Sequence, residues 1–503
     1  MGNHKKLLQF LRPDLAVAAA PAKSSSTTSD DDDDSYCGYN TTCSTPATPT
    51  TSASASASTA ASPYAASPWT QLPGLSPRSG PDDATRQRTG LLGSLVKEGG
   101  GHVYSLAAEG DLLYTGTDSR NVRVWRDRRE LGGFRSGSGL VKAIVVAADG
   151  RIYTGHQDGK VRVWRRAEDP AAGAAAVGQH RRVGSLPRFR DVVRSSLRPS
   201  QYVQTRRRHS GLWMRHFDAV SSLSLDAAAG LIYSASWDRT FKVWRVSDSK
   251  CLESVYAHTD AVNAVAAVGF DALVLTGSAD GTVKVWRRGT KAGSNKKKGR
   301  RDQADTWHTM ERVLREGDSA VTAIAVAVES RVVYVGSSDG AVAHWQWRRG
   351  AAPGAAPRNG GALWGHKMAV LCLAVAGRVV VSGSADRTIN VWRREEGADH
   401  ARLAVLTGHT GPVKCVAMDT EEVDGAGDDD APRRWVVYSG SLDGSVKVWR
   451  VSDSGGCGGG IAPDLTTTTP ARYWKGSSPS PLRSWTDAAR VPRAAESRIA
   501  CLA

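Results

Sequence analysis

The chain has 503 residues, a formal net charge of +16 at pH 7 and seven cysteines. An odd cysteine count without metal-site spacing argues against a disulfide scaffold and favours a reducing compartment. Because it shows neither a secretory signal nor an apolar run of about 18 residues, the sequence predicts a soluble intracellular protein without a membrane partner.

The two ends of the chain differ in composition from the middle. Residues 1–88 are rich in Ser, Thr, Ala and Pro, and residues 454–503 in Gly, Thr, Pro, Ser and Arg. Both lack the bulky apolar residues that offset chain entropy, so we expect disordered tails.

The opening Met-Gly-Asn-His-Lys-Lys places Gly2 where myristate attaches, but Lys6 departs from the Ser or Thr of that signal. An unmodified tail is therefore the expectation.

One phrase with an Asp turn and a closing Trp occurs seven times between the tails. Its apolar residues alternate on both sides of the Asp, as in a β-hairpin. Recurrence at about 40 to 45 residues is typical of a propeller with four-stranded blades. The copies are YTGTDSRNVRVW (114–125), YTGHQDGKVRVW (153–164), YSASWDRTFKVW (233–244), LTGSADGTVKVW (275–286), YVGSSDGAVAHW (334–345), VSGSADRTINVW (381–392) and YSGSLDGSVKVW (438–449).

Four copies also carry a His four residues before the Val that starts the blade. This pattern resembles the WD40 repeat family, in which such a His, the turn Asp, a strand hydroxyl and the Trp form one hydrogen-bonded chain. A half-buried Asp needs such donors. Blades 1, 2 and 5 lack the His, so we expect apolar packing to dominate there. The resemblance implies the chains His216–Asp238–Trp244, His258–Asp280–Trp286, His366–Asp386–Trp392 and His409–Asp443–Trp449.

We therefore expect an all-β, seven-bladed WD40 propeller over residues 89–453, in a monomeric protein. A closed ring leaves few exposed strand edges. No fourth strand follows the last copy, so the apolar run at 91–96 is predicted to complete blade 7. Insertions interrupt the pattern at about 166–210, 289–306 and 420–433.

The three insertions differ in character. The first holds Phe189, Val192, Val193 and Leu197 at helical spacing, which predicts an amphipathic helix packed on the propeller. The third is acidic and is expected to be a solvated loop. The second carries a basic cluster that resembles a nuclear import signal, with a solvated loop as the alternative; its residues are Lys296, Lys297, Lys298, Arg300 and Arg301.

Two aromatic residues are candidates for partner binding. The Asp turns and His loops share one end of every blade, so the residue before the Asp should point out of that end. In blade 3 this residue is Trp237, and Phe217 should lie beside it. Large aromatic residues often dominate interfaces, which favours an exposed anchor. Packing of Trp237 against a neighbouring blade is the alternative.

The chain carries no pattern that predicts an enzyme. It has no Walker loop, H-E-x-x-H, G-x-S-x-G or Cys/His cluster, and its recurring Asp and His belong to the blade pattern. We expect no catalytic residue, cofactor, metal or small-molecule substrate. The positive charge could attract nucleic acid, but no aromatic-interleaved groove or reader motif accompanies it. Direct nucleic-acid binding is therefore only an alternative.

Over residues 90–452 the chain resembles a plant WD40 group called JINGUBANG. The resemblance rests on the run from Arg215 to Ser254, the Arg-rich insertion before it, and the blade 2 stretches GLVKAI and TGHQDGKVRVW. It implies a non-enzymatic regulator of pollen germination and tube growth, shared between cytoplasm and nucleus. Its partners would be proteins, with transcriptional regulators as candidates. The alternative from the same fold is a substrate receptor of a cullin ubiquitin ligase, to which the motif Trp125-Arg126-Asp127-Arg128 comes nearest.

Overall fold

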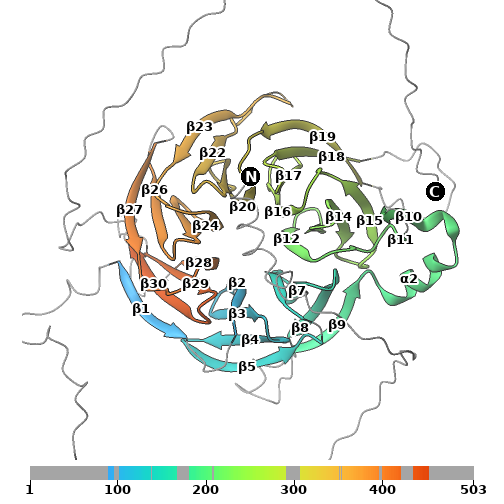
Figure 1. Cartoon of the computed structure of the whole chain (residues 1–503), viewed down its shortest axis with the longest axis horizontal. Helices are drawn as coiled ribbons and strands as arrows, with labels where there is room; N and C mark the ends of the chain where they lie inside the picture. The colour runs from blue at the N-terminus through green and yellow to red at the C-terminus, as the bar shows by residue number, and fades with distance from the viewer. Residues whose placement is uncertain are drawn as a thin grey trace, which may run out of the picture. The chain divides into compact units, whose positions relative to one another are not determined.

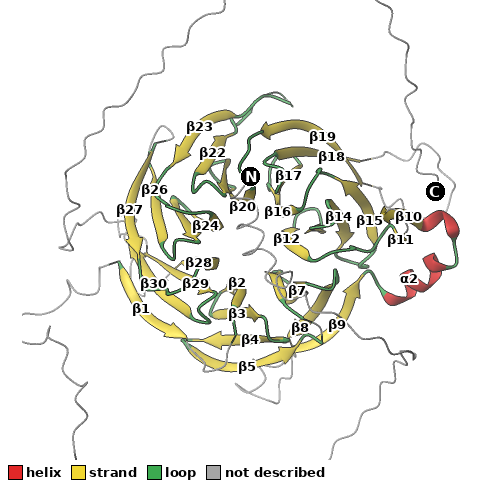
Figure 2. Cartoon of the chain, viewed as in Figure 1, coloured by secondary structure: helices red, strands yellow, loops and turns green. Residues whose placement is uncertain are grey.

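Seven four-stranded sheets stand around a ring in the computed structural model (Figures 1 and 2). The phrase that recurs seven times thus gives the seven-bladed β-propeller expected from it. The predicted tails lie outside the described residues, as do the basic cluster at 296–301 and most of the acidic insertion. The structure describes residues 89–95, 101–137, 139–166, 180–206, 209–290, 306–350, 352, 354–395, 399–420 and 434–452.

The first four blades follow one another along the chain, and each is an antiparallel sheet with its strands in sequence order. Blade 1 is β2 (Val103–Glu109), β3 (Leu112–Thr117), β4 (Asn121–Arg126) and β5 (Arg129–Arg135), and blade 2 is β6 (Val141–Val146), β7 (Arg151–His156), β8 (Val161–Arg166) and β9 (His180–Leu186). Blade 3 is β12 (Val220–Asp226), β13 (Leu231–Ser236), β14 (Thr240–Arg245) and β15 (Cys251–Tyr256), and blade 4 is β16 (Val262–Ala267), β17 (Leu273–Ser278), β18 (Val283–Thr290) and β19 (Thr306–Arg315).

Blades 5 and 6 repeat this order, whereas blade 7 takes its fourth strand from the start of the propeller. Blade 5 is β20 (Val321–Ala327), β21 (Val332–Ser337), β22 (Val342–Gln346) and β23 (Arg358–Leu363), and blade 6 is β24 (Val370–Ala376), β25 (Val379–Ser384), β26 (Ile389–Arg394) and β27 (His400–Leu406). Blade 7 is β28 (Val413–Thr420), β29 (Arg434–Ser441), β30 (Val446–Ser452) and β1 (Gly90–Leu95).

The core lies between neighbouring blades. The second strands β3, β13, β17, β21 and β25 are buried at every position because blades cover both of their faces. Their Tyr, Val, Leu and Ile side chains suit such positions. The first strands face the axis and the fourth strands form the rim, where side chains alternate between the core and solvent (Figure 1).

A small residue on each second strand lies against the first-strand Val of the next blade. A Cβ placed on Gly277 would lie 2.4 Å from the Cγ1 atom of Val321, so blade 4 leaves no room for a side chain at this position. Blade 3 has Ala235 at this position, in one cluster with Val262. The other contacts are Gly116 to Val141, Gly155 to Val220, Gly336 to Val370, Gly383 to Val413 and Gly440 to Val103.

A second contact joins blades in pairs at the rim. The hydroxyl of Tyr233 in blade 3 lies 3.2 Å from His308 Nε2 in blade 4, and His308 Nδ1 lies 2.7 Å from a Glu253 carboxylate oxygen. Burial raises the pKa of Tyr233 to about 12, so this hydroxyl stays protonated and can donate. The equivalent pairs are Tyr114 with His180 (blades 1 and 2) and Tyr334 with His400 (blades 5 and 6).

Strand β1 closes the ring, as the apolar run at 91–96 predicts. It pairs antiparallel with β30, with Gly90 opposite Arg450 and Leu95 opposite Val446. Leu95 is buried in a cluster that contains Val103 of blade 1 and Val446 of blade 7. The first strand of the propeller therefore covers the edge of the last.

The first insertion forms a helix that is far less packed than expected. Helix α2 (Phe189–Ser196) precedes a 3-10 turn, η4 (Pro199–Gln201), and the hairpin β10 (Tyr202–Arg206) and β11 (His209–Leu212). No residue of α2 is buried, and of its apolar stripe only Val192 packs on the cluster between blades 2 and 3. The prediction of a helix packed on the propeller is therefore wrong for Phe189 and Leu197, which project away from the ring.

Deleting residues 89–97 should expose the edge of β30, lower the melting temperature and promote self-association. Calorimetry and light scattering after size exclusion would measure both effects. Deletion of residues 80–88, of the same length but leaving β1 intact, is the matched control. A β1 deletion that melts at the wild-type temperature as a monomer would contradict the assignment of β1 as the closing strand.

Candidate functional site

All blades present the same kinds of loop at one end of the ring. The loops that lead into the first strands and the turns between second and third strands share this end, because the strands of a blade alternate in direction. We call it the His–Asp face, after the loop histidines and turn aspartates it contains, such as His216 and Asp238. The connections between first and second strands and between third and fourth strands lie at the opposite end.

A continuous polar chain runs through blade 3 beneath this face. The Trp244 Nε1–H donates to Ser234 Oγ at 2.8 Å, Ser234 Oγ lies 2.8 Å from His216 Nε2, and His216 Nδ1 lies 2.9 Å from Asp238 Oδ2. A neutral His216 that donates from Nδ1 to Asp238 and accepts from Ser234 satisfies every contact. The chain therefore ties the loop, the turn and two strands together.

The other three predicted chains are formed in the same way in blades 4, 6 and 7. In each, the turn Asp also accepts backbone N–H groups from the His loop and from its own turn. The His to Asp distances are 3.1 Å for His258 and Asp280, 3.1 Å for His366 and Asp386, and 2.9 Å for His409 and Asp443. The hydroxyls that link these histidines to Trp286, Trp392 and Trp449 belong to Thr276, Ser382 and Ser439.

The chains hold their carboxylates ionised. Burial alone would raise the pKa of Asp238, but His216 and Thr240 hold that pKa well below its ordinary value. The same balance of burial against hydrogen bonds lowers the pKa of Asp280, Asp386 and Asp443. Burial lowers the pKa of His216 below its ordinary value despite the neighbouring carboxylate. In blade 3 a charged Asp is thus stabilised by neutral donors.

Blade 2 builds a polar chain from a different position. His156, at the end of β7, replaces the Ser found there in most other copies. Its Nε2 lies 2.8 Å from Thr154 Oγ1, which also accepts from Trp164 Nε1 at 2.9 Å, while Asp158 pairs with Arg162 at 2.8 Å. The expectation that apolar packing dominates this blade is wrong, because the imidazole comes from the strand instead of the loop.

Blade 5 fits the expectation of apolar packing. Val335 takes the place of the strand hydroxyl and shares a buried cluster with Trp345. Asp339 accepts from its own turn, at Ser337 and Ala341 N, and lies 3.7 Å from an Arg315 nitrogen. Blade 5 therefore retains the turn without the chain that crosses the blade.

Blade 1 keeps half of the chain. Trp125 Nε1 donates to Thr115 Oγ1 at 3.0 Å, and Asp118 accepts the backbone N–H of His102 at 3.2 Å. The His102 ring does not reach the strand hydroxyl but bonds to the carbonyl of Leu442 in blade 7. This histidine supports the junction that closes the ring.

Trp237 is a core residue, which corrects the prediction that it is an exposed anchor. Its side chain is 7% exposed and packs in a cluster of small residues that includes Ala219 and Ala279. The Lys142 ammonium lies 4.5 Å from its ring centroid. Alanines at the starts of the inner strands leave room for one indole, so Trp237 fills space near the axis. Phe217 is 40% exposed, and Gly211 of β11 lies close to its ring.

Further exposed aromatic residues of the His–Asp face lie in its other loops. Trp364 is 64% exposed and stands directly before Gly365-His366, and Met368 of the same loop is 46% exposed. Tyr256, two residues before His258, is 63% exposed and lies 3.4 Å from an Arg239 nitrogen. Sequence reasoning missed Trp364. A Trp in a His loop, outside the strand-closing phrase, was the available signal.

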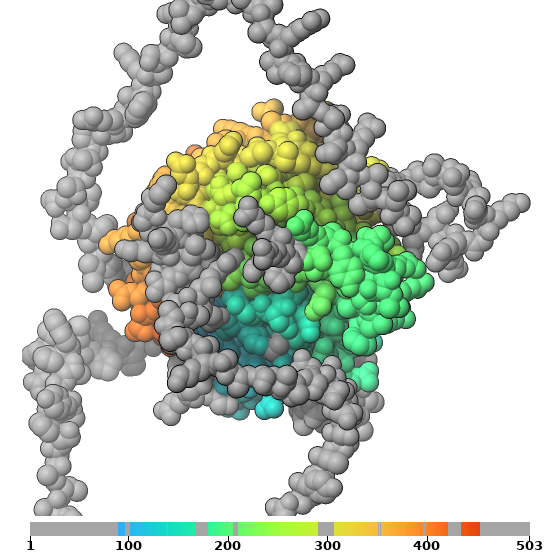
Figure 3. Space-filling view, turned by 45° about the vertical axis from the view of Figure 1, so that its right-hand side comes forward, coloured from blue at the N-terminus to red at the C-terminus, as the bar shows by residue number. Residues whose placement is uncertain are grey.

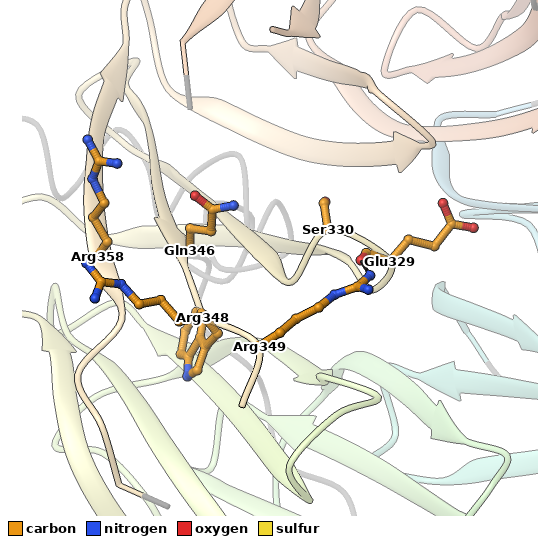
Figure 4. A pocket seen from close by; sticks show the side chains of 7 residues that line it. Glu329, Ser330, Gln346, Arg348, Arg349 and Arg358 are labelled. Carbon is orange, nitrogen blue, oxygen red and sulfur yellow. Dashed lines mark hydrogen bonds between the residues drawn. The ribbon is translucent and has the colours of Figure 1, made fainter. Parts of the chain in front are cut away.

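A shallow hollow lies at the opposite end of blade 5. It has a volume of about 430 Å³, and Arg348 and Arg358 lie toward one side of it, with Glu329 toward the other (Figure 4). Arg349 donates to the carbonyl oxygen of Glu329 at 2.7 Å. The described ranges contain no group of three or more His, Cys, Asp or Glu placed to hold a metal.

The WD domain, G-beta repeat family matches five segments of the chain, at residues 93–126, 209–245, 249–287, 360–393 and 401–450. The chain therefore contains WD40 repeats. The segments span all or most of the first three strands of blades 1, 3, 4, 6 and 7, and the last four of these blades carry complete His–Asp–Trp chains. Blade 2, with its strand histidine, and the first three strands of blade 5 lie outside the matched segments.

One solved structure is similar to this chain. The crystal structure of the WD40 beta propeller domain of Doa1 is 19% identical in sequence, with a TM-score of 0.48. The match covers 74% of this chain and 100% of that one. Comparison with curated protein sequences gives no match. Among the described residues, no helix has the length and apolar character needed to span a membrane.

Asp280→Ala should remove the acceptor of His258, Thr259 and Thr282 and destabilise the protein by about 1 to 3 kcal/mol. Asp339→Ala should cost less, because blade 5 has no His to leave unpaired. Denaturant titration of both variants would measure the two free energies of unfolding. Equal losses would contradict the difference between the two blades.

Acidification should destabilise blade 2 through His156, whose pKa burial lowers to about 4 from 6.5. Because the unfolded state takes up the proton first, the contribution of His156 is complete above pH 6.5 and is lost as pH falls toward 4. His156→Ser should therefore weaken the pH dependence of unfolding between pH 6.5 and 4, measured by denaturant titration at several pH values. An unchanged slope would show that His156 does not titrate in this window.

Proposed function

We propose that this WD40 protein is a non-enzymatic scaffold that binds protein partners through the His–Asp face. The observation that carries the proposal is the exposure of Trp364 and Met368 in one loop of that face. The seven Trp of the repeated phrase are buried or nearly so, which sets Trp364 apart. Large aromatic side chains are enriched among the residues that dominate interface energies.

The polar chains support this role by fixing the loops. Trp364 lies two residues before His366, whose ring is held by Asp386 and Ser382. The Asp386 carboxylate also accepts the backbone N–H of Lys367 at 2.9 Å. A partner that binds here meets a loop whose backbone is already ordered, which reduces the entropy lost on binding.

The resemblance to the JINGUBANG group supports a finer proposal. The protein would act as a regulator of pollen germination and tube growth in a plant, moving between cytoplasm and nucleus. Transcriptional regulators are its candidate partners. The basic cluster Lys296, Lys297, Lys298, Arg300 and Arg301 would serve nuclear import; it lies outside the described residues, in the connection between β18 and β19.

Two alternatives differ in what they require. A cullin ligase receptor would use the motif Trp125-Arg126-Asp127-Arg128, but Arg126 lies 2.6 Å from an Asp111 carboxylate oxygen and Arg128 donates to the carbonyl of Leu92. These contacts favour a structural role at the junction of blades 1 and 7.

Nucleic-acid binding would use free basic side chains, yet Arg245, Arg287 and Arg393, which follow the blade Trp, pair with acidic residues. Protein binding is the better supported proposal.

Trp364→Ser with Met368→Ser should reduce recovery of partners about tenfold or more without changing the melting temperature, because both side chains are exposed. Quantitative affinity purification with mass spectrometry would measure recovery per folded molecule. Met310→Ser, at a 51% exposed position on the rim strand β19, is the matched control. Equal recovery with the variant and the wild type would remove this loop as the binding site.

Trp237→Ala should instead lower the free energy of unfolding by about 3 to 5 kcal/mol.

Replacing the five basic residues at 296–301 with Ala should shift a fluorescent fusion toward the cytoplasm. The fold should persist, because the segment lies outside the blade pattern, and thermal melting of the purified variant checks this. A nuclear fraction that does not change would exclude the cluster as the import signal.

A further inference from the structure

The insertion between blades 2 and 3 presents an apolar surface that the propeller leaves uncovered. Phe189 and Leu197 are 78% and 79% exposed, and Val193 between them is exposed as well. On β10, Tyr202 is also exposed, and its hydroxyl donates to the carbonyl of Ser196 at 3.3 Å. These four residues are called the α2 patch. Exposed apolar surface gathered in one place marks an interaction site more often than scattered residues do.

The α2 patch stands on a platform that is firmly attached to blade 3. Lys242 is buried, and its ammonium donates to the carbonyl of Trp213 at 2.6 Å. Trp213 Nε1 in turn donates to Gln201 Oε1 at 2.6 Å, and Val192 packs inward from α2. The insertion projects beside the ring in Figure 1 and stands out in green in Figure 3. Its apolar face is therefore held outward by contacts on the other side.

The border of the patch is strongly basic. Arg190, Arg194 and Arg198 are exposed and follow the apolar stripe along α2 with the same spacing of four residues. Asp191 is the one acidic residue among ten arginines between positions 181 and 215. A ligand for this surface must therefore combine negative charge with bulky apolar groups.

We infer that the α2 patch binds the segment Asp30–Tyr39 of the chain's own amino-terminal region. This segment carries five consecutive Asp residues followed closely by Tyr36 and Tyr39. The carboxylates complement the arginine row, and the tyrosine rings complement the exposed Phe and Leu side chains. The contact covers the patch and adds a regulatory device beside the proposed binding face, on which it does not depend.

Chain length permits this contact. Residues 40–88 join the segment to β1 and span up to about 160 Å when extended. A domain of this size has a radius of about 20 to 30 Å, so the segment reaches any point on the ring. Tethering keeps its effective concentration on the order of 1 mM or somewhat below. A weak intramolecular contact is therefore enough to occupy the patch.

The other acidic segment of the chain is a poorer occupant. The insertion between β28 and β29 has acidic residues at 421, 422, 424 and 428–430 but no aromatic residue. It leaves from the end of the ring opposite the His–Asp face, in blade 7, whereas α2 follows β9 at the His–Asp face. A loop of this length, held at both ends, extends only about 20 Å. This acidic insertion therefore serves as the matched control in the hydrogen-exchange experiment.

Hydrogen exchange on the full-length protein tests the intramolecular contact. Replacing Asp30 to Asp34 with Asn should speed exchange of the α2 amides at least threefold, because the covering segment is released. Replacing Asp428, Asp429 and Asp430 with Asn should leave that exchange unchanged. Equal exchange in the wild type and the Asp30 to Asp34 variant would overturn the proposal.

Peptide binding tests the chemistry of the patch. A fluorescent peptide of residues 26–42 should bind the full-length variant in which Asp30 to Asp34 are Asn, as measured by anisotropy. Phe189→Ser with Leu197→Ser, or Arg190, Arg194 and Arg198→Gln, should each weaken this binding at least tenfold. Arg348→Gln with Arg358→Gln, at exposed positions at the opposite end of the ring, should not. Failure of the peptide to bind, together with sedimentation of the protein on phosphatidylserine vesicles through Phe189, would assign the patch to a lipid surface and overturn the proposal.

Discussion

The propeller depends on the close contact between the second strand of each blade and the first strand of the next. At Gly277 a single added carbon would approach the Val321 side chain to 2.4 Å, and a Gly or Ala occupies this position in all seven blades. Packed interiors tolerate such added volume poorly. The small residue in the repeated phrase is therefore a requirement of blade spacing, and every other feature rests on the ring radius that this contact sets.

The loops of the His–Asp face are held in place by the spacing between blades and by the polar chains within them. Where a loop His reaches across to a strand hydroxyl, as His366 does, the backbone of the whole loop is fixed by a charged and buried carboxylate. Such networks are most valuable when every member is satisfied. The loop can then present Trp364 to solvent without losing its shape.

The sequence predicts repeated features well and single residues poorly. Blade number follows from the spacing of the copies, ring closure by β1 follows from the strand missing after the last copy, and the four His–Asp–Trp chains follow from the resemblance to the WD40 repeat. Trp237, His156 and helix α2 do not follow from spacing. Burial of Trp237 depends on alanines contributed by other blades, and His156 reaches a site that spacing assigns to a loop residue. The periodicity of α2 predicts a helix but not which side of it the propeller covers.

The Tyr and His contacts at the rim divide the ring unevenly. They join blades 1 with 2, 3 with 4 and 5 with 6, whereas blade 7 is tied to the ring through β1. The junctions without a Tyr–His contact have polar contacts of their own, such as the Arg331–Asp271 ion pair between blades 5 and 4 and the Asn263 side chain that donates to the carbonyl of Val321. Three of the seven junctions between blades are thus reinforced by a Tyr–His contact at the rim, whereas the other four depend on different contacts, so the rigidity of the ring varies around its circumference.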